Sequence, residues 1–362
     1  MPRTKLEMGH VEYWQVLDEN GQVDTKLEPQ LPPEDLRRLY RTMLLARMVD
    51  DRMYKLQAQG RMGTFPGVRG QEACVGITYA LESGDWLQPA FRETACLFWR
   101  GIPPKRVLEY FAGMEEGNVF PPEAKTLPIP ICVGSQTLHA TGVAWAEMIR
   151  QTRNVTLCYF GDGGTSEGDF HEALNLAGVY KIPIVYVCMN NQWAISVPRS
   201  IQSASKTLAQ KAIAYGFPGL QIDGNDFLAA VVAGRAAVAH ARSGKGPTFI
   251  EMVTYRLGPH TTADDAKRYR NEEEVQQWLP KDPLVRARKY LEKKKLWSPQ
   301  WQAELEAEFT EQIEQEVQAY EQELAAIDPL DMFEYAYAEK TPELAAQKEQ
   351  AAAFLQQAAE HH

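Results

Sequence analysis

The sequence predicts an α/β fold: a doubly wound, mostly parallel sheet with helices on both faces. Two apolar runs, 155–160 and 182–189, have the length and composition of strands that are buried on both sides. A helical stretch lies between them, so the three segments form one βαβ unit. Strand and helix patterns alternate from 85 to 253, which is typical of a parallel sheet whose ligands bind at the carboxyl ends of the strands.

The chain before and after this region has a different character. The N-terminal segment is typical of an irregular arm with some strand character, and Pro32-Pro33-Glu34-Asp35 then opens a long helix that ends near Gly60. From about residue 271 the chain is charged and helical. We therefore expect an N-terminal arm over 1–32, an α/β domain over 33–295 and a C-terminal helical extension over 296–362.

The elements of the α/β domain follow from local patterns. A second, more buried helix is expected from Gly70-Gln71-Glu72-Ala73, and the helix between the two apolar runs should bury Phe170, Ala173, Leu174, Ala177 and Tyr180. Further helices are expected near 103–113, 137–150, 207–215 and 226–243, and further strands near 86–87, 219–224 and 248–253. Residues 127–136 have two prolines and a glycine inside an apolar run, which predicts an irregular buried loop.

Composition excludes several classes of function. The formal net charge of −10 disfavours binding to nucleic acid or to an anionic membrane surface. No apolar run approaches the roughly 20 residues that span a bilayer, and the acidic first thirty residues do not resemble a signal peptide. Five scattered cysteines without a CxxC pair favour buried, reduced thiols. We expect a cytoplasmic protein that acts on a small molecule.

Polar residues follow both strands of the βαβ unit. Gly161-Asp162-Gly163-Gly164 comes after the first strand and Asn190-Asn191 after the second. Because neighbouring parallel strands end at the same edge of the sheet, Asp162 and Asn191 should lie close together. Their oxygens are the hard ligands that Mg²⁺ prefers, and glycines allow a backbone to approach phosphate. The pair, 29 residues apart, resembles the thiamine-diphosphate signature.

Three further residues fall where such a site would be built. Arg92 follows a short strand and could meet a diphosphate. His260 lies in a polar loop after the strand at 248–253, where it could orient a phosphate or carry a proton. Val133 lies in the irregular apolar loop and could face a ring. Each has an ordinary alternative, which is a surface salt bridge, a solvated histidine and core packing respectively.

The whole pattern resembles the α chain of the thiamine-diphosphate-dependent dehydrogenase component of 2-oxo acid dehydrogenase complexes. The motifs run in order from about residue 33 to 295. They are Gly70-Gln71-Glu72-Ala73, Phe91-Arg92-Glu93, Ile131-Cys132-Val133-Gly134-Ser135-Gln136, Gly161-Asp162-Gly163, Ser166-Glu167-Gly168-Asp169, Asn190-Asn191, Ala194-Ile195-Ser196, Tyr255-Arg256-Leu257-Gly258-Pro259-His260-Thr261, Asp264-Asp265 and Tyr269-Arg270.

The resemblance implies a role for each matching position. Asp162, Asn191 and the main-chain carbonyl of Trp193 would hold Mg²⁺. Arg92, Phe91, Gly163 and Gly164 would contact the diphosphate, although many relatives have tyrosine where this chain has Phe91. The backbone of Ile131 and both backbone and side chain of Val133 would support the aminopyrimidine. His260 would be the catalytic histidine near the thiazolium. Thr261 matches a serine that animal enzymes phosphorylate.

The activity implied is oxidative decarboxylation of a 2-oxo acid with thiamine diphosphate, and transfer of the acyl group to a lipoyl domain. The glutamate that should hydrogen-bond the pyrimidine has no convincing place here, since Glu72 and Glu167 match a helix start and the helix after the metal motif. In two-chain relatives that glutamate belongs to a β subunit. We therefore expect an α₂β₂ heterotetramer, with a lipoyl-bearing acyltransferase as a transient partner.

The sequence leaves alternatives open for the substrate and for the class of protein. Residues 206–212 and 281–286 look like bacterial pyruvate-type chains, whereas the loop 260–265 has the spacing of branched-chain enzymes, and pyruvate is favoured. Acetoin dehydrogenase fits less well because of Asp264-Asp265. A plain dinucleotide-binding module is disfavoured, because the segment 161–166 of this chain lacks the third glycine of the G-x-G-x-x-G motif. A non-catalytic scaffold would not require Asp162, Asn191 and His260 together. Whether His361-His362 is a tag remnant stays open.

Overall fold

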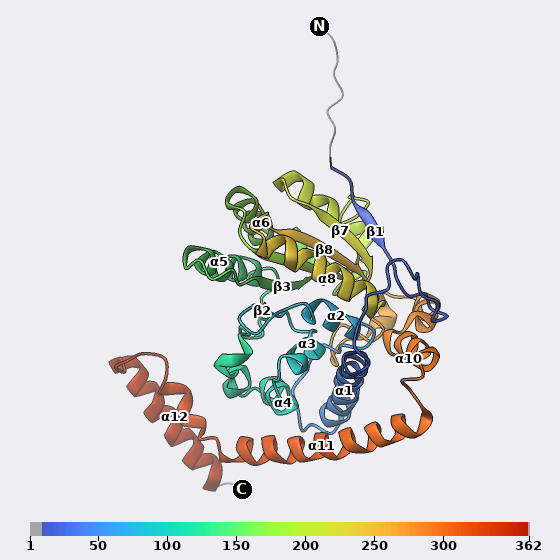
Figure 1. Ribbon diagram of the computed structural model, residues 1–362. Helices are drawn as coiled ribbons and strands as arrows, with labels where there is room; N and C mark the ends of the chain where they lie inside the picture. Colours follow the sequence, from blue (N-terminus) through green and yellow to red (C-terminus); the bar gives the residue numbers. More distant parts are fainter. Residues whose placement is uncertain (1–8, 361–362) are drawn as a thin grey trace. The chain divides into compact units, whose positions relative to one another are not determined.

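Six parallel strands form the central sheet of the computed structural model, which describes residues 9–360 (Figure 1). Their order across the sheet is β1-β7-β8-β4-β3-β2. The strands are β1 (Glu12–Trp14), β2 (Trp86–Gln88), β3 (Thr156–Gly161), β4 (Ile184–Asn190), β7 (Gly219–Asp223) and β8 (Thr248–Val253), and a small hairpin joins β5 (Trp193–Ala194) to β6 (Val197–Pro198). The predicted doubly wound α/β fold is confirmed.

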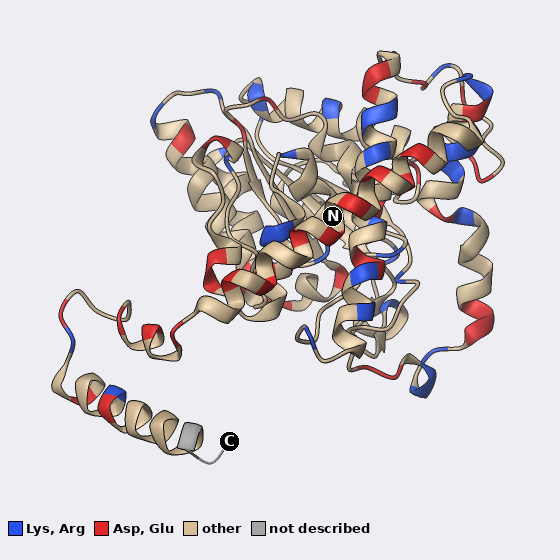
Figure 2. Ribbon diagram, turned by 90° about the horizontal axis from the view of Figure 1, so that it is seen from below, with Lys and Arg blue, Asp and Glu red and all other residues tan. Residues whose placement is uncertain are grey.

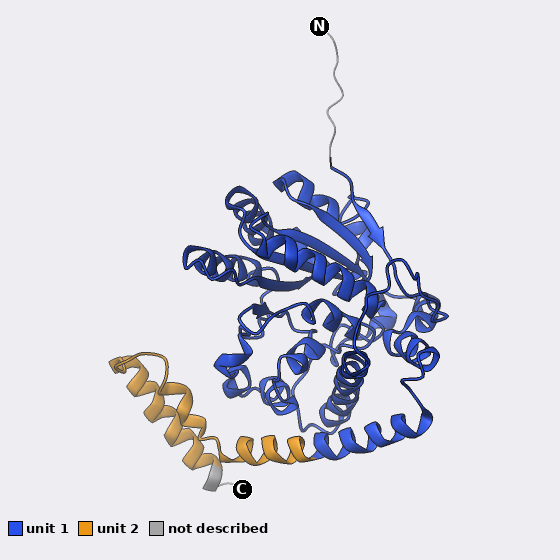
Figure 3. Cartoon of the chain, in the orientation of Figure 1, with its two compact units in different colours: residues 1–314 blue, residues 315–362 orange. Residues whose placement is uncertain are grey.

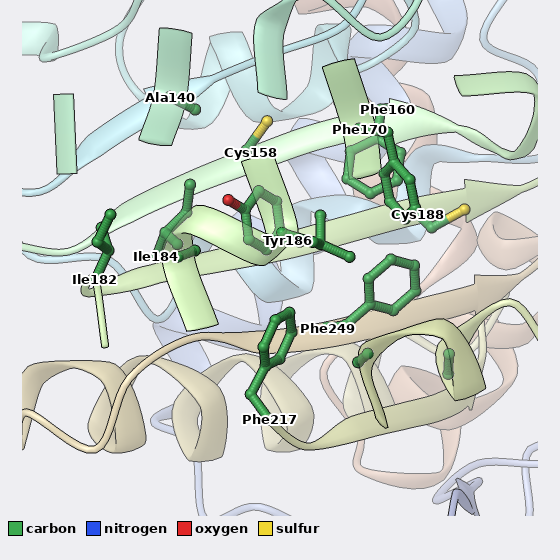
Figure 4. Packing of buried hydrophobic residues seen from close by; sticks show 14 of the residues in the cluster. Ala140, Cys158, Phe160, Phe170, Ile182, Ile184, Tyr186, Cys188, Phe217 and Phe249 are labelled. Carbon is green, nitrogen blue, oxygen red and sulfur yellow. The ribbon is translucent and has the colours of Figure 1, made fainter. Parts of the chain in front are cut away.

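One face of the sheet is covered by α5 (Gln136–Ile149), α6 (Gly168–Tyr180) and the 3₁₀ helix η5 (Ala209–Tyr215). Aromatic rings fill this layer, with Phe160 at 5.5 Å from Phe170 and 5.9 Å from Phe249 between ring centres (Figure 4). Alternate residues of β3 point the other way, because side chains alternate along a strand. The hydroxyl of Tyr159 therefore donates to the carbonyl of Cys74 on the opposite face, at 2.8 Å.

The opposite face packs against α8 (Phe227–Arg242), which in turn packs against α2 (Val75–Thr78). Two glycines allow the backbones of these helices to touch. A Cβ at Gly76 would lie 2.5 Å from the carbonyl oxygen of Phe227, and one at Gly234 would lie 2.8 Å from the Cα of Ile77. Any larger residue at either position would push the helices apart. The second helix predicted from Gly70 onward is present but short. It consists of the 3₁₀ helix η1 (Glu72–Cys74) followed directly by α2.

The described residues form further helices besides these. They are α1 (Pro33–Ala58), α3 (Thr94–Trp99), α4 (Pro104–Ala112), η2 (Glu115–Asn118), η3 (Pro122–Ala124), η4 (Asp162–Ser166), α7 (Arg199–Gln202), η6 (Ala266–Arg268), α9 (Glu272–Trp278), η7 (Leu279–Lys281), α10 (Pro283–Lys293), α11 (Pro299–Ala326), η8 (Pro329–Phe333) and α12 (Pro342–Glu360). One predicted burial is wrong: Tyr180 at the end of α6 is 50% exposed and stacks on Trp145 instead of entering the core.

The N-terminal arm, so far as it is described, is part of the sheet. β1 pairs in parallel with β7 and forms one edge of the sheet. The carboxylate of Asp226 holds the next residues, because its Oδ2 accepts hydrogen bonds from the backbone N–H of Val16 and Leu17 while its Oδ1 caps α8. Residues 1–8 of the predicted arm, like His361-His362, lie outside the described residues.

The chain divides into two compact units, residues 1–314 and 315–362 (Figure 3). The division falls inside α11, so the expected boundary near residue 296 stays a prediction. Acidic and basic residues lie on many of the helices and loops (Figure 2), whereas β3 and β4 contain none. None of the helices in residues 9–360 has the length and apolar character needed to cross a membrane.

Candidate functional site

A cavity of about 230 Å³ opens at the carboxyl ends of β3 and β4. These strands are neighbours, and Gly161 pairs in register with Met189, so the residues after them meet at one level of the sheet. The lining contains nine of the ten residues expected to bind the cofactor. They are Phe91, Arg92, Val133, Asp162, Gly163, Gly164, Asn191, Trp193 and His260. Ile131 is not part of this lining and is 55% exposed.

Asp162 begins the 3₁₀ turn η4 directly after β3. Its carbonyl accepts a hydrogen bond from Gln202 Nε2 at 2.6 Å, which fixes the backbone at this point. The side chain is 1% exposed, and within residues 9–360 its Oδ2 has no hydrogen-bond partner. Burial raises the pKa of the Asp162 carboxyl to about 6. An unpaired buried carboxylate is costly, so this position fits a bound cation.

The second strand contributes Asn191 and Trp193. The backbone N–H of Trp193 donates to Asn191 Oδ1 at 3.2 Å, which leaves one lone pair of that oxygen free. The carbonyl of Trp193 accepts from Arg256 Nη1 at 3.2 Å. Asn190 has a different role, because its Nδ2 donates to the buried carboxylate of Glu251 at 2.7 Å. Only the second asparagine of the doublet is therefore available to the cavity.

The residues at this edge fit the magnesium ion that the sequence implied. In the described part of the chain no cluster of three or more His, Cys, Asp or Glu side chains could hold a metal. A set made of one carboxylate, one carboxamide and one backbone carbonyl instead suits Mg²⁺, which usually takes few protein groups and completes its shell with water and phosphate oxygens. The orphaned Oδ2 of Asp162 is the observation that supports this fit.

Arg92 supplies a buried positive charge to the same cavity. Its Nη2 donates to the carbonyl of His260 at 2.7 Å and its Nη1 donates to the carbonyl of Gly67. Across residues 9–360 it forms no ion pair, although its side chain is only 6% exposed. Burial and the nearby Arg256 lower the pKa of Arg92 to about 10, so it stays charged at neutral pH. The predicted alternative, a surface salt bridge, is wrong, and this buried charge fits a bound anion.

His260 is half-buried beside Arg92. Arg92 Nη2 lies 3.1 Å from His260 Nδ1, and because a guanidinium can only donate, Nδ1 must accept. Burial, together with Arg92 and Arg256, lowers the pKa of His260 to about 4. The imidazole is therefore neutral at physiological pH and has its proton on Nε2. The backbone N–H of His260 also donates to Asp264 Oδ2 at 2.7 Å, which shapes the loop.

Arg256 links this loop to the loop that follows β4, a role that the sequence did not reveal. Besides Trp193, it donates through Nη2 to the carbonyl of Ile195 at 2.8 Å and to the hydroxyl of Tyr269 at 2.8 Å. Tyr269 in turn donates to Asp264. Arg256 is 1% exposed. Its place inside the Tyr255-Arg256 motif was the only signal in the sequence, and nothing there indicated which carbonyls it would reach.

The loop at 127–136 corrects one prediction. It was expected to be buried, but Ile131 and Val133 are 55% and 48% exposed, and Cys132 is exposed as well. Gly134 has a φ of +91° and lies so close to Glu167 that a Cβ would meet its side chain at 2.9 Å. Only Ile129 of the loop's aliphatic residues is fully buried, whereas Val133 lines the cavity and is about half exposed.

The two glutamates considered for the pyrimidine occupy different places. Glu72 is fully buried, pairs with Arg47 and does not line the cavity. Glu167 is exposed and lines the cavity beside Gly134. Glu93, which the sequence left without a role, also lines the cavity, and burial raises the pKa of its carboxyl to about 7.

Comparison with known proteins agrees with this geometry. Residues 40–327 match the family model described as "Dehydrogenase E1 component". A pyruvate dehydrogenase E1 component subunit alpha from Acholeplasma laidlawii is 44% identical, over 94% of this chain and 99% of its own length. A 3-methyl-2-oxobutanoate dehydrogenase subunit alpha from Mycobacterium tuberculosis is also 44% identical, over 90% of this chain and 89% of its own length. A pyruvate dehydrogenase E1 component subunit alpha from Staphylococcus aureus is 46% identical, over 78% of each chain.

Proposed function

This chain belongs to the dehydrogenase E1 component family, and we propose that it is the α subunit of a pyruvate dehydrogenase (acetyl-transferring) that uses thiamine diphosphate and Mg²⁺. The match confirms the family predicted from the sequence motifs. One observation carries the proposal to this site: an orphaned, buried carboxylate (Asp162) and an unpaired, buried guanidinium (Arg92) line the same cavity. A magnesium diphosphate satisfies both charges at once.

The residues of this chain would then divide the work. Asp162 Oδ2, Asn191 Oδ1 and the carbonyl of Trp193 would hold the metal. Arg92 would contact the diphosphate, and Gly163 and Gly164 would allow its close approach. When bound, thiamine diphosphate supplies the carbanion chemistry that removes CO₂ from a 2-oxo acid. His260 would present a neutral Nε2–H donor near the reacting atoms, because Arg92 occupies its Nδ1.

The same site supports a second subunit. Among residues 9–360, Glu93 and Glu167 line the cavity; Glu167 is exposed, and the Oε2 of the buried Glu93 already accepts hydrogen bonds from the backbone N–H of Ala90 and Arg92. Apolar side chains also stand exposed at the mouth. We define the apolar rim as Val133 and Ile195, which line the cavity, together with Ile131, which lies two positions before Val133 in the same loop; the three are 48–57% exposed. We infer a β subunit that covers this rim and supplies the missing glutamate, in an α₂β₂ heterotetramer.

The proposal extends to the partner and the location. A lipoyl-bearing acyltransferase would accept the acetyl group, with His260 placed to act in that transfer. A cytoplasmic location is consistent with the acidic composition and with the absence of a spanning helix from residues 9–360. A catalytically silent scaffold is disfavoured, since a scaffold has no need for the unpaired charges of Asp162 and Arg92.

Branched-chain 2-oxo acids are the second candidate substrates. The spacing of the loop from His260 to Asp265 favours them, and relatives named for the two substrates are similarly close, at 44–46% identity for pyruvate and 44% for the branched substrate. The segments 206–212 and 281–286 favour pyruvate. Part of the substrate pocket would belong to the β subunit, so the side chain that this enzyme accepts must be measured.

The decisive experiment co-expresses this chain with its β subunit and compares pyruvate with 3-methyl-2-oxobutanoate. Decarboxylation is followed with thiamine diphosphate, Mg²⁺ and a dye acceptor. A preference for pyruvate is the expected result, and a preference for the branched substrate would replace it with the second candidate. Cofactor binding without turnover of either substrate would point to another 2-oxo donor. A complex that binds no thiamine diphosphate would overturn the proposal.

A further inference from the structure

Gln71 is a buried side chain at the cavity that neither the metal site nor the reaction has yet explained. It lines the cavity and is 1% exposed. Its Oε1 accepts a hydrogen bond from Asn191 Nδ2 at 3.0 Å. Its Nε2 has no hydrogen-bond partner anywhere in residues 9–360. A buried amide with one satisfied end and one free donor is costly unless a ligand completes it.

The orientation of both amides follows from the backbone. The N–H of Trp193 donates to Asn191, so the atom facing Trp193 must be the oxygen Oδ1. Asn191 therefore turns its Nδ2 toward Gln71, and Gln71 must answer with Oε1. This leaves Nε2 of Gln71 as the free end. The free donor is thus fixed by a main-chain hydrogen bond and does not depend on a choice of amide rotamer.

The fold holds Gln71 rigidly in this place. Gly70, with a φ of +92°, packs against the chain that follows β8: a Cβ there would lie 2.8 Å from the carbonyl oxygen of Tyr255. The hydroxyl of Thr254 donates to the carbonyl of Gly70 at 2.9 Å, and the N–H of Gly70 donates to Glu72 Oε2 at 3.0 Å. Two hydrogen bonds and one close backbone contact therefore fix Gly70, the residue before Gln71.

We propose that Gln71 is a positioning residue for the metal ligand Asn191 and a direct donor to the bound diphosphate. Its Oε1 holds the Asn191 amide so that the second lone pair of Oδ1 faces the metal. Its Nε2 donates to an oxygen of the diphosphate or to a water on the metal. The inference deepens the proposed function and rests on it, because both roles require a metal diphosphate in this cavity. Removing such a supporting hydrogen bond typically weakens metal binding about 10- to 100-fold.

Three variants of the co-expressed complex separate the two roles. Gln71→Met keeps the length of the side chain and removes both hydrogen bonds. Gln71→Glu keeps the acceptor for Asn191 and replaces the free donor with a carboxylate oxygen. Gln88→Met is the matched control, since Gln88 is a buried glutamine outside the cavity lining whose Nε2 donates to the carbonyls of Pro89 and Pro128. Mn²⁺ binding is measured by electron paramagnetic resonance at saturating thiamine diphosphate, and thiamine diphosphate binding by tryptophan fluorescence at saturating Mn²⁺.

Gln71→Met should raise the Kd for Mn²⁺ about 10- to 100-fold and change the Mn²⁺ spectrum. Gln71→Glu should bind Mn²⁺ no more weakly than the wild type, but should bind thiamine diphosphate about tenfold more weakly or worse. Gln88→Met should leave the Kd for Mn²⁺ within about threefold. Unchanged Mn²⁺ binding in Gln71→Met, or an equal loss in Gln88→Met, would overturn the inference alone. A wild-type complex that binds no thiamine diphosphate would overturn the proposed function as well.

Discussion

The floor and the rim of the cavity are built in opposite ways. On the floor, Asp162, Asn191 and Arg92 are at most 6% exposed, and each is fixed by hydrogen bonds that leave a free polar group. At the rim, Ile131, Val133 and Ile195 are apolar and about half exposed. Under the proposed function, a metal ion and the diphosphate would complete the floor, whereas the β subunit would cover the rim. Catalytic competence should require both, and each can be broken without the other.

The largest expected effect comes from Asp162→Asn, which breaks the floor alone. Mg²⁺-dependent binding of thiamine diphosphate should fall by more than about 100-fold, because loss of a direct ligand exceeds the loss caused by a supporting residue. Isothermal titration of the complex at fixed Mg²⁺ measures this. Asp169→Asn is the matched control, since Asp169 is exposed in the first turn of α6, and it should bind normally.

The same variant tests whether the carboxylate serves the fold. Asp162→Asn removes an unpaired buried charge, so the free energy of unfolding of the cofactor-free chain should stay equal or rise. Denaturant titration of the two chains without cofactor provides the comparison. A clear loss of stability would mean that Asp162 is a structural residue, and it would contradict the assignment of the floor.

The next effect comes from Ile131→Asp, which breaks the rim alone. Ile131 is 55% exposed and does not line the cavity, so the substitution should leave the stability of the α chain within about 0.5 kcal/mol. Association with the β subunit should weaken about tenfold or more, because a carboxylate would be desolvated in an apolar contact. Sedimentation of the purified subunits measures the Kd. Val119→Asp, at 63% exposure away from the cavity, should associate normally.

Much of the floor could be predicted, because its residues follow directly after strands that are recognisable in the sequence. Asp162 and Asn191 each follow a buried strand directly, and the neighbouring parallel strands bring their ends together. The order of motifs identified the family, which the comparisons confirmed. The exposure of Ile131 and Val133 was not predicted, because an apolar run predicts burial. Sequence patterns do not distinguish burial within one chain from burial against another chain.

The supporting residues could not be predicted for a different reason. Arg256 acts on carbonyls 61 and 63 positions away, and Gln71 contacts a residue 120 positions away. No periodicity links such positions, because the contacts arise only once the loops after β4 and β8 lie side by side. Tyr180 was placed in the core by helical spacing, yet it lies at the last residue of α6, where the helix ends at the surface.

His260 lines the cavity and is partly buried, and the pH dependence of stability should show how far it is shielded from water. Burial lowers its pKa from 6.5 to about 4, so the folded chain favours the neutral imidazole. The stability that this provides is fully present above about pH 6.5 and is lost as the pH falls toward 4, because the unfolded chain then binds a proton that the folded chain refuses. Urea titrations of wild type and His260→Gln at pH 7.5, 5.5 and 4.5 should show a steeper loss in the wild type. Parallel curves would mean that His260 is fully solvated.

The smallest effect should come from Phe91→Tyr, which adds to the floor what many relatives have there. Phe91 lines the cavity, and the Arg92 guanidinium carbon lies 5.5 Å from the centre of its ring, so a hydroxyl on that ring would face the region assigned to the diphosphate. One added hydrogen bond contributes about 0.5–1.5 kcal/mol, which corresponds to roughly two- to tenfold tighter binding of thiamine diphosphate. Fluorescence titration at saturating Mg²⁺ measures the change, with Phe98→Tyr, outside the cavity, as the control. Weaker binding by Phe91→Tyr would mean that this chain has closed the space for the hydroxyl. The floor would then hold the diphosphate through Arg92, Gln71 and the metal, without a hydroxyl at position 91.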